Sequence, residues 1–234
     1  MQLALRKLFY LAASIFFMAP TLIYCYDAYC GWCYGFSTVI KQLETELKDK
    51  IHIEVLSGGM IPAELSHAIE KSAPHIKEQY KRVEELSGIE FGADFLWHIN
   101  NPDLSDWFIN SEKPAIALCI FKDYYPDRQV EFAADLQHAL IYEGRDLTDN
   151  EAYRHLLEKY SINEEAFYQK LKNEEYKEAA LYEFALCKQL QITDFPALLL
   201  QMSDTKFHLI AKGFTKIEDV RDRILQVLTA SKKE

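Results

Sequence analysis

The chain lacks the patterns that hold a structural zinc ion and those that attract nucleic acid. It has one CxxC pair, no second pair to complete a four-ligand site, and no HxxxH or HExxH spacing among its seven histidines. Its 26 lysine and arginine residues are outnumbered by 36 aspartate and glutamate residues, and the net charge of −10 disfavours nucleic acids and anionic membrane surfaces as partners. We therefore expect no metal site and no nucleic-acid partner.

Glycine is scarce in the middle of the chain. Between residues 60 and 192, only Gly88, Gly92 and Gly144 interrupt a largely helical periodicity, so we predict five to seven helices there. These helices either bury their aromatic residues in a core or use some of them to line a groove that faces the cysteines. The aromatic residues in question are Phe91, Phe95, Trp97, Trp107 and Phe108.

The N-terminal segment lacks an apolar run long enough for a clear membrane span. Arg6 and Lys7 precede the apolar residues 8–18, a run shorter than the roughly 20 residues of a membrane helix. The same pattern is typical of a secretory signal, but a predicted strand already begins at Thr21. We interpret residues 1–20 as a leader or an N-terminal extension. We favour a cytoplasmic protein without a stable membrane span and leave export to the periplasm open.

The one CxxC motif, Cys30-Gly31-Trp32-Cys33, lies where a strand meets a helix. The apolar residues 22–26 precede it, and behind it apolar side chains recur every three or four residues. A helix N-terminus presents unpaired N–H groups and a partial positive charge, so it favours the thiolate of Cys30 over the thiol. The spacing predicts a redox dithiol in which Cys30 attacks a disulfide and Cys33 resolves the mixed disulfide. A purely structural disulfide is the alternative.

The two ends of the chain predict two parts of one sheet. Residues 51–56 alternate apolar and polar as a half-buried strand does, so the dithiol lies in a β–α–β unit. Residues 197–201 and 207–211 predict a hairpin, and Thr215 with Glu218 has the spacing of a capping box that opens a final helix. The tail therefore predicts a β–β–α unit.

This layout is similar to the thioredoxin fold, an α/β fold, with a large α-helical insertion between its β–α–β and β–β–α halves. The chain resembles the DsbA-like family, and more closely its FrnE-type branch, over nearly all of residues 21–230. The matching segments are Asp27-Ala28-Tyr29-Cys30-Gly31-Trp32-Cys33, Phe195-Pro196 before a strand, and Gly213-Phe214 before the last helix. The usual FrnE-type dipeptide between the cysteines is Pro-Trp, whereas this chain has Gly31-Trp32. Because this dipeptide helps to set the redox poise, the direction of electron flow is not transferred with the resemblance.

The resemblance also implies a domain organisation. Residues 21–59 and 193–231 would form the thioredoxin-like domain, and residues 60–192 the helical insertion. We expect this insertion to pack against the dithiol and to influence which substrates fit.

Several residues beside the dithiol receive roles from the resemblance. Asp27 matches an acid that would raise a thiol pKa or relay a proton to Cys33, unless it is merely a turn residue. Pro196 matches the family's cis-proline, which would leave the Phe195 carbonyl free to pair with a substrate strand, unless it is an ordinary trans proline. Gly31 and Trp32 complete the predicted site.

The predicted activity is that of a thiol–disulfide oxidoreductase or isomerase acting on protein or peptide thiols and disulfides, or on a small thiol such as glutathione. It needs no cofactor beyond the redox-active Cys30–Cys33 disulfide, with glutathione as a candidate. Two alternatives stay open. One is a glutathione-dependent isomerase or transferase of the kappa or hydroxychromene-carboxylate type, although those enzymes tend to carry serine in place of Cys30. The other is a non-catalytic module whose aromatic helices capture peptides.

Three further cysteines stand alone in apolar surroundings. Cys25, Cys119 and Cys187 are typical of buried small hydrophobic residues, which suit a reducing compartment. A structural bridge between Cys119 and Cys187 is the alternative, because both lie in the predicted insertion.

Overall fold

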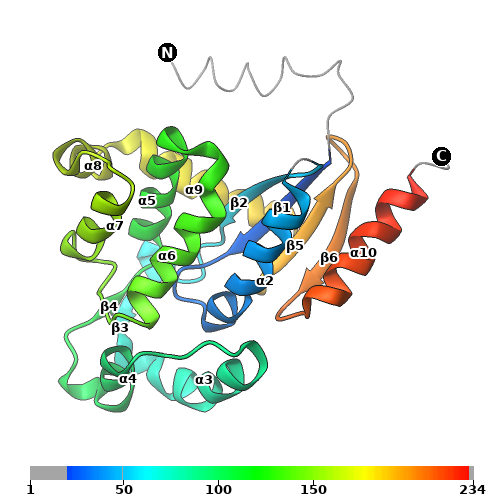
Figure 1. Ribbon diagram of the computed structural model, residues 1–234. Coiled ribbons are helices and arrows are strands. Elements are labelled where there is room, and N and C mark those ends of the chain that lie inside the picture. Colours follow the sequence, from blue (N-terminus) through cyan, green and yellow to red (C-terminus); the bar gives the residue numbers. More distant parts are fainter. Residues whose placement is uncertain (1–19, 49, 232–234) are drawn as a thin grey trace.

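A four-stranded sheet with the strand order β2-β1-β5-β6 forms the centre of the computed structural model, which describes residues 20–48 and 50–231 (Figure 1). The predicted leader, residues 1–20, lies almost entirely outside the described residues. Strand β1 (Thr21–Tyr26) pairs in parallel with β2 (His52–Ser57) and antiparallel with β5 (Ala197–Gln201). Strand β6 (Phe207–Lys212) pairs antiparallel with β5 and forms the second edge of the sheet.

Two helices complete the core around this sheet. Helix α2 (Gly31–Leu47) joins β1 to β2, and α10 (Ile217–Ala230) follows β6 and contacts both β6 and α2. These are the predicted β–α–β and β–β–α units, so the predicted thioredoxin-like α/β fold is confirmed. The predicted capping box is wrong: Lys216 caps α10 without a side-chain bond, and the Thr215 hydroxyl donates to the Gly213 carbonyl at 3.3 Å.

Seven α-helices lie between β2 and β5, a stretch that the structure describes in full, and they reach the upper end of the predicted number. They are α3 (Ala73–Ser87), α4 (Ala93–Asn100), α5 (Glu112–Tyr124), α6 (Gln129–Ile141), α7 (Arg154–Lys159), α8 (Glu164–Leu171) and α9 (Glu174–Gln189). Short 3₁₀ turns connect several of these helices. They are Ala63–Leu65, Ile69–Lys71, Pro102–Leu104, Pro126–Arg128 and Glu151–Tyr153. The sequence did not predict the small sheet in which β3 (His67–Ala68) pairs with β4 (Phe108–Ile109).

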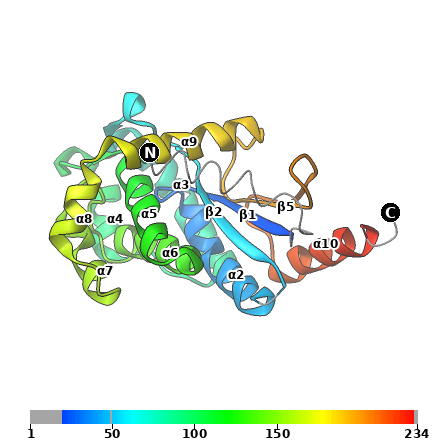
Figure 2. The ribbon, with the colours of Figure 1, turned by 90° about the horizontal axis from the view of Figure 1, so that it is seen from above.

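Strand β1 is buried on both faces. Leu22, Tyr24 and Tyr26 belong to the main core, which also includes the buried side of α2. Ile23 and Cys25 point the other way, into a smaller apolar cluster covered by the end of α9. Figure 2 shows the sheet between α9 on one side and α2 on the other. Helix α9 of the insertion therefore covers one face of the sheet.

Side chains from the insertion form hydrogen bonds with the backbone groups on the outer edge of β2. The Val55 N–H donates to Gln129 Oε1 at 3.0 Å, and the Ser57 N–H donates to Glu183 Oε2 at 2.8 Å. The Lys122 ammonium donates to the Val55 carbonyl. An edge strand exposes a row of such backbone groups, and here α5, α6 and α9 supply the partners that a fifth strand would otherwise provide.

A buried charge cluster accompanies this edge. Lys122 Nζ lies 2.7 Å from Glu183 Oε1 and 3.0 Å from Glu54 Oε1. Burial by itself would lower the pKa of Lys122, but the two carboxylates outweigh it and raise that pKa above its usual value. Burial likewise opposes ionisation of Glu54, yet Lys122, His52 and Gln129 lower the pKa of Glu54 to about 2. Lys122 and Glu54 are therefore both charged at neutral pH, and the ion pairs of Lys122 fasten the insertion to the sheet.

Over residues 20–48 and 50–231, none of the helices has both the length and the apolar character needed to cross a membrane.

Candidate functional site

Cys30 is the N-cap residue of α2. Its Sγ accepts a hydrogen bond from the Cys33 N–H at 3.3 Å, so the thiol occupies the place of the usual serine or aspartate cap. The Cys30 carbonyl accepts the Tyr34 N–H and starts the helical pattern. The cysteine sulfur thus lies where the unpaired N–H groups of the helix converge, as the position of the motif predicted.

The two cysteines differ in environment. Cys30 retains 6% exposure, whereas Cys33 is fully buried inside the first turn of α2. Burial, followed by the hydrogen bond and charge of the neighbouring Cys30, raises the pKa of the Cys33 thiol well above its usual value. Cys33 therefore keeps its proton at neutral pH, and Cys30 is the sulfur that an incoming molecule meets.

The Phe195–Pro196 segment lies against Cys30. The peptide bond between these two residues is cis, so the predicted cis-proline is confirmed. The Cys30 Sγ–H donates to the Phe195 carbonyl at 3.5 Å. The ring of Phe195 packs so closely on Gly58 that a Cβ there would be 2.1 Å from Phe195 Cζ. Gly58, at the end of β2, is thus required for the two segments to approach one another.

Asp27 is a buried carboxylate beneath the dithiol. Its Oδ1 accepts the Tyr29 N–H and the Ser111 hydroxyl, each at 3.0 Å, and its Oδ2 accepts the Met60 N–H at 2.7 Å. Burial raises the pKa of Asp27, and these hydrogen bonds partly counter the rise. The charge of Asp27 is in turn one of the influences that raise the pKa of Cys33. The two groups are therefore electrostatically linked.

Two side chains of the insertion form hydrogen bonds with the segment that carries the dithiol. Gln137 Nε2, from α6, donates to the Asp27 carbonyl at 3.1 Å and lies 3.4 Å from the Cys30 carbonyl. The Trp32 indole N–H donates to Gln79 Oε1, from α3, at 2.7 Å. The sequence did not single out Ser111, Gln137 or Gln79, because none belongs to a motif. The expected packing of the insertion against the dithiol is present in these contacts.

Gly31 lies against an aromatic ring of the insertion. A Cβ at this position would be 3.2 Å from Phe91 Cζ. Phe91 packs against the rings of Tyr34, Tyr80 and Phe95, so it has little room to move. A proline at position 31, as in the FrnE-type motif, would place its Cβ against the same ring.

The aromatic residues of the insertion divide between core and surface. Phe91, Phe95 and Trp107 are buried, as the core interpretation predicted. Trp97 and Phe108 are about half exposed, at 48% and 58%. Of the five, Phe91 lies against Gly31 of the CxxC segment. Trp32 instead packs near Phe214, whose ring centroid lies 6.4 Å away.

The remaining three cysteines are buried, as predicted, but two of them share one cluster. All five cysteines are free thiols, and no Cys119–Cys187 bridge is present. Cys119 instead donates to Glu183 Oε1 at 3.5 Å. Cys187 is not alone, because it shares a buried apolar cluster with Cys25 where α9 covers β1. Docking of α9 on the sheet, which the sequence does not specify, creates this pair.

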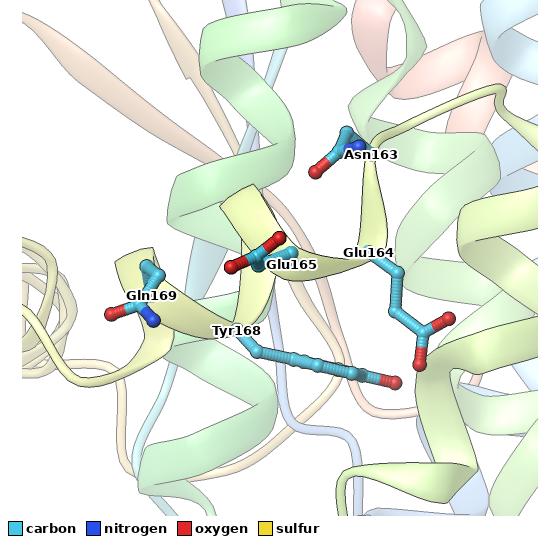
Figure 3. A pocket seen from close by; sticks show the side chains of 5 residues that line it. All are labelled: Asn163, Glu164, Glu165, Tyr168 and Gln169. Carbon is cyan, nitrogen blue, oxygen red and sulfur yellow. The ribbon is translucent and has the colours of Figure 1, made fainter.

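A shallow pocket lies at the start of α8 and contains no thiol (Figure 3). Its lining comes from one short segment: Asn163, Glu164, Glu165, Tyr168 and Gln169. Asn163 Oδ1 accepts the Ala166 N–H at 2.8 Å and so caps the helix. Glu164 pairs with Arg154 at 3.1 Å. These side chains therefore serve the local structure of α8, and the dithiol remains the candidate site.

Comparison with known proteins agrees with this geometry. The model of a family described as the DSBA-like thioredoxin domain matches residues 21–224. No curated protein sequence matches the chain.

Solved structures share the fold over almost the whole chain. A proposed protein disulfide isomerase from Nitrosomonas europaea has a TM-score of 0.79 at 24% identity, covering 91% of this chain and 99% of that one. The cytosolic disulfide reductase DsbM from Pseudomonas aeruginosa has a TM-score of 0.67 at 22% identity, covering 90% and 99%, and has also been solved with glutathione. A 2-hydroxychromene-2-carboxylate isomerase has a TM-score of 0.59 at 11% identity, covering 91% and 95%.

Proposed function

The chain belongs to the DSBA-like thioredoxin domain family, and on this basis we propose that it exchanges disulfides through Cys30 and Cys33. The predicted family, fold and enzyme class, that of the disulfide oxidoreductases and isomerases, agree with this membership. The FrnE-type branch stays a prediction. The observation that carries the proposal is the placement of Cys30 Sγ between the Cys33 N–H and the Phe195 carbonyl.

The first chemical step takes place at Cys30. Its thiolate attacks one sulfur of a substrate disulfide, a new S–S bond forms, and the other substrate sulfur leaves as a thiolate. The Cys33 N–H and the N-terminus of α2 stabilise the negative charge on Cys30 before the attack. The Phe195 carbonyl, on the other side of the sulfur, offers an acceptor to the backbone of an extended substrate.

The second step releases the substrate. Cys33 attacks the Cys30 sulfur, the mixed disulfide breaks, and the Cys30–Cys33 disulfide forms as the second substrate thiolate leaves. Cys33 must first lose its proton, which its raised pKa opposes. Asp27 is a buried carboxylate with a raised pKa and is electrostatically linked to Cys33, so we assign it the role of proton acceptor. Run in reverse, the same steps oxidise a substrate dithiol.

We propose protein or peptide disulfides as substrates and glutathione as the small thiol that recycles the pair. Two glutathione molecules reduce the Cys30–Cys33 disulfide and leave as glutathione disulfide, which balances the cycle. The glutathione found with the Pseudomonas aeruginosa reductase supports this choice. That reductase is described as cytosolic, and together with the three additional free cysteines this supports a cytoplasmic location.

A second candidate is a glutathione-dependent isomerase. Its support is the fold shared with the 2-hydroxychromene-2-carboxylate isomerase. Such a reaction requires glutathione but no resolving cysteine, so it predicts that Cys33 is dispensable. The intact Cys30–Cys33 pair favours disulfide exchange.

Three variants test the proposal in a fluorescence assay that follows reduction of a peptide–glutathione mixed disulfide. We expect Cys30→Ser to lose at least about 100-fold in rate, because the nucleophile is gone. Cys33→Ser should stall with one substrate molecule bound to Cys30, detectable by intact-protein mass spectrometry. Cys119→Ser is the matched control, since it removes a buried thiol outside the site and should exchange as the native protein does. Full activity of Cys30→Ser would overturn the proposal, and full activity of Cys33→Ser would show that glutathione, rather than Cys33, resolves the mixed disulfide.

A further inference from the structure

A second pair of thiols lies on the face of β1 opposite to the dithiol. Cys25 is fully buried, and its neighbours along the strand, Tyr24 and Tyr26, point into the other core. Cys187, near the end of α9, is 1% exposed. The apolar cluster that encloses both consists of Ile23, Cys25, Leu56, Cys187, Ile192, Ala197 and Leu199. The strand and the helix therefore bring together two cysteines that are far apart in the chain.

The two cysteines lie on elements that pack together. The Cys187 Sγ–H donates to the Ser57 carbonyl at 3.7 Å, and Ser57 directly follows Leu56, the residue of β2 that pairs with Cys25. The neighbouring Cys25 thiol and burial raise the pKa of Cys187 far above its usual value. Two cysteines held in one buried cluster can form a disulfide once their sulfurs come within bonding distance. The raised pKa of Cys187 makes that thiol slow to react.

We propose that Cys25 and Cys187 form a second redox pair, which a small two-electron oxidant converts into a disulfide that joins β1 to α9. Diamide illustrates the balance. The Cys25 thiolate adds to one nitrogen of the azo bond, Cys187 attacks the Cys25 sulfur, and the reduced hydrazine leaves with both electrons and both protons. Because both sulfurs are buried, the reaction proceeds through local opening of α9.

The bridge would lie on a helix whose side chains contact residues 57–59, next to the segment that binds Asp27. On α9, Glu183 accepts the Ser57 N–H, and the Phe184 ring lies where a Cβ on Gly59 would be only 2.5 Å from Phe184 Cγ. Met60, which follows Gly59 in the chain, donates its N–H to Asp27. A covalent bond at Cys187 would therefore fix the helix that supports the segment holding Asp27. The proposed bridge does not depend on whether Cys30 and Cys33 catalyse exchange.

The experiment uses full-length protein carrying Cys30→Ser and Cys33→Ser, which leaves Cys25, Cys119 and Cys187 of the five cysteines. The folded protein is treated with diamide, quenched with acid, and alkylated after unfolding. We expect two of the three thiols to become unavailable, and tryptic digestion to yield residues 178–188 linked to the peptide that contains Cys25. Adding Cys119→Ala should leave this result unchanged, whereas adding Cys187→Ala should abolish it.

The disulfide should also leave a physical signature. Because it closes a long loop, it should raise the unfolding midpoint by several degrees, and dithiothreitol should reverse the rise. The proposal is overturned if all three thiols survive in the folded protein while diamide oxidises the Cys30–Cys33 pair of the native chain. It is equally overturned if Cys119 is found in the bridge, or if the Cys25–Cys187 link forms only after unfolding.

Discussion

The backbone N–H of Cys33 points at the sulfur of Cys30, 3.3 Å away, while the Cys33 side chain is fully buried behind it. Cys33 thus has two roles in the dithiol. Its backbone N–H stabilises the Cys30 sulfur, and its own thiol lies buried in the first turn of the helix. This relationship makes the two cysteines unequal in reactivity, and the predictions below begin from that inequality.

We predict that iodoacetamide modifies Cys30 well before Cys33. In the reduced native protein at pH 7, the label should appear on Cys30, which is partly accessible. In Cys30→Ser, Cys33 should react at least about tenfold more slowly, and its rate should still be rising above pH 9, because the pKa of Cys33 is raised. Peptide mapping after timed labelling measures both rates. Rapid labelling of Cys33 at pH 7 would contradict the prediction.

The choice of serine in that variant follows from the cap. The serine oxygen can accept the Cys33 N–H as Cys30 Sγ does, whereas alanine cannot. We expect Cys30→Ala to lose about 1 kcal/mol of unfolding free energy relative to Cys30→Ser. Urea unfolding of the two variants under reducing conditions measures the difference, and equal stabilities would show that the cap contributes nothing.

Asp27 should raise the pKa of Cys33 through its charge. We therefore expect Asp27→Asn in the Cys30→Ser background to move the Cys33 titration to lower pH, as followed by thiolate absorbance near 240 nm. In a chain with both cysteines, the same substitution should slow the release of mixed disulfides, because the proton acceptor is lost. Ser111→Ala serves as a comparison, since it removes one hydrogen bond from Asp27 but keeps the charge. An unchanged Cys33 titration in Asp27→Asn would show that the carboxylate does not act on the thiol.

Sequence reasoning reached the parts of this site that are encoded locally. The dithiol, the helix behind it and the proline-led strand each follow from a short stretch of residues, and the cis bond at Pro196 was predicted by family resemblance. Gln137 reaches the site from α6, and Ser111 from the position just before α5. Their contacts with Asp27 depend on how those two helices dock. No local pattern distinguishes such residues from other polar side chains.

The same limit explains the cysteine assignments. Cys25 and Cys187 each lie in an ordinary apolar run, so the sequence describes each as a lone buried thiol. They share one buried cluster because α9 covers the second face of the sheet. Because β1 is apolar on both faces, its sequence does not indicate which helix packs against either face.

Lys122 should be essential to the attachment of the insertion. We expect Lys122→Met to lose about 3–5 kcal/mol of unfolding free energy at pH 7, because the buried Glu183 and the partly exposed Glu54 lose their counter-charge. Arg154→Ala is a matched control: it breaks exposed ion pairs with Glu151 and Glu164 and should lose less than about 1 kcal/mol. Chemical denaturation of each variant gives the values. A loss no larger than that of the control would show that the cluster does not hold the edge of β2.

The pH dependence of that loss has a defined sign. Because the folded pKa of Glu54 is lowered to about 2, its contribution is complete above the unfolded value of about 4.5 and disappears as pH falls towards 2. The native protein should therefore lose stability between about pH 5 and pH 2, and Lys122→Met should show a flatter curve over that range. Parallel curves for the two proteins would contradict the assigned role of Lys122.

Gly31 should be preferred over alanine because of Phe91. We expect Gly31→Ala to lose about 1 kcal/mol, since its Cβ would meet a ring that its neighbours hold in place. In a Phe91→Leu background the same change should be close to neutral. A double-mutant cycle in urea isolates the coupling between the two positions. A cost of the same size in both backgrounds would assign it to the helix start rather than to the ring.

Tyr24 should assist Cys33 from the β1 side of the core. Its hydroxyl is buried close to the Cys33 thiol, yet within the described residues it has no partner with good hydrogen-bond geometry. Burial, followed by the charges of Cys33 and Cys30, raises the pKa of Tyr24, so the hydroxyl stays a donor throughout the working pH range. An unpaired buried donor is costly in the dithiol state, but it can stabilise the Cys33 thiolate when that anion forms during resolution.

Tyr24→Phe should therefore separate stability from chemistry. We expect the reduced variant to be at least as stable as the native protein, because an unsatisfied hydroxyl has been removed. In the Cys30→Ser background the Cys33 titration should move to higher pH, and with both cysteines present, mixed disulfides should persist several-fold longer. Tyr153→Phe is the matched control, because its hydroxyl donates to the Leu147 carbonyl at 2.7 Å within the insertion. That variant should lose about 1 kcal/mol of stability and leave the Cys33 titration unchanged, and if Tyr24→Phe behaves in the same way, the hydroxyl has only a packing role.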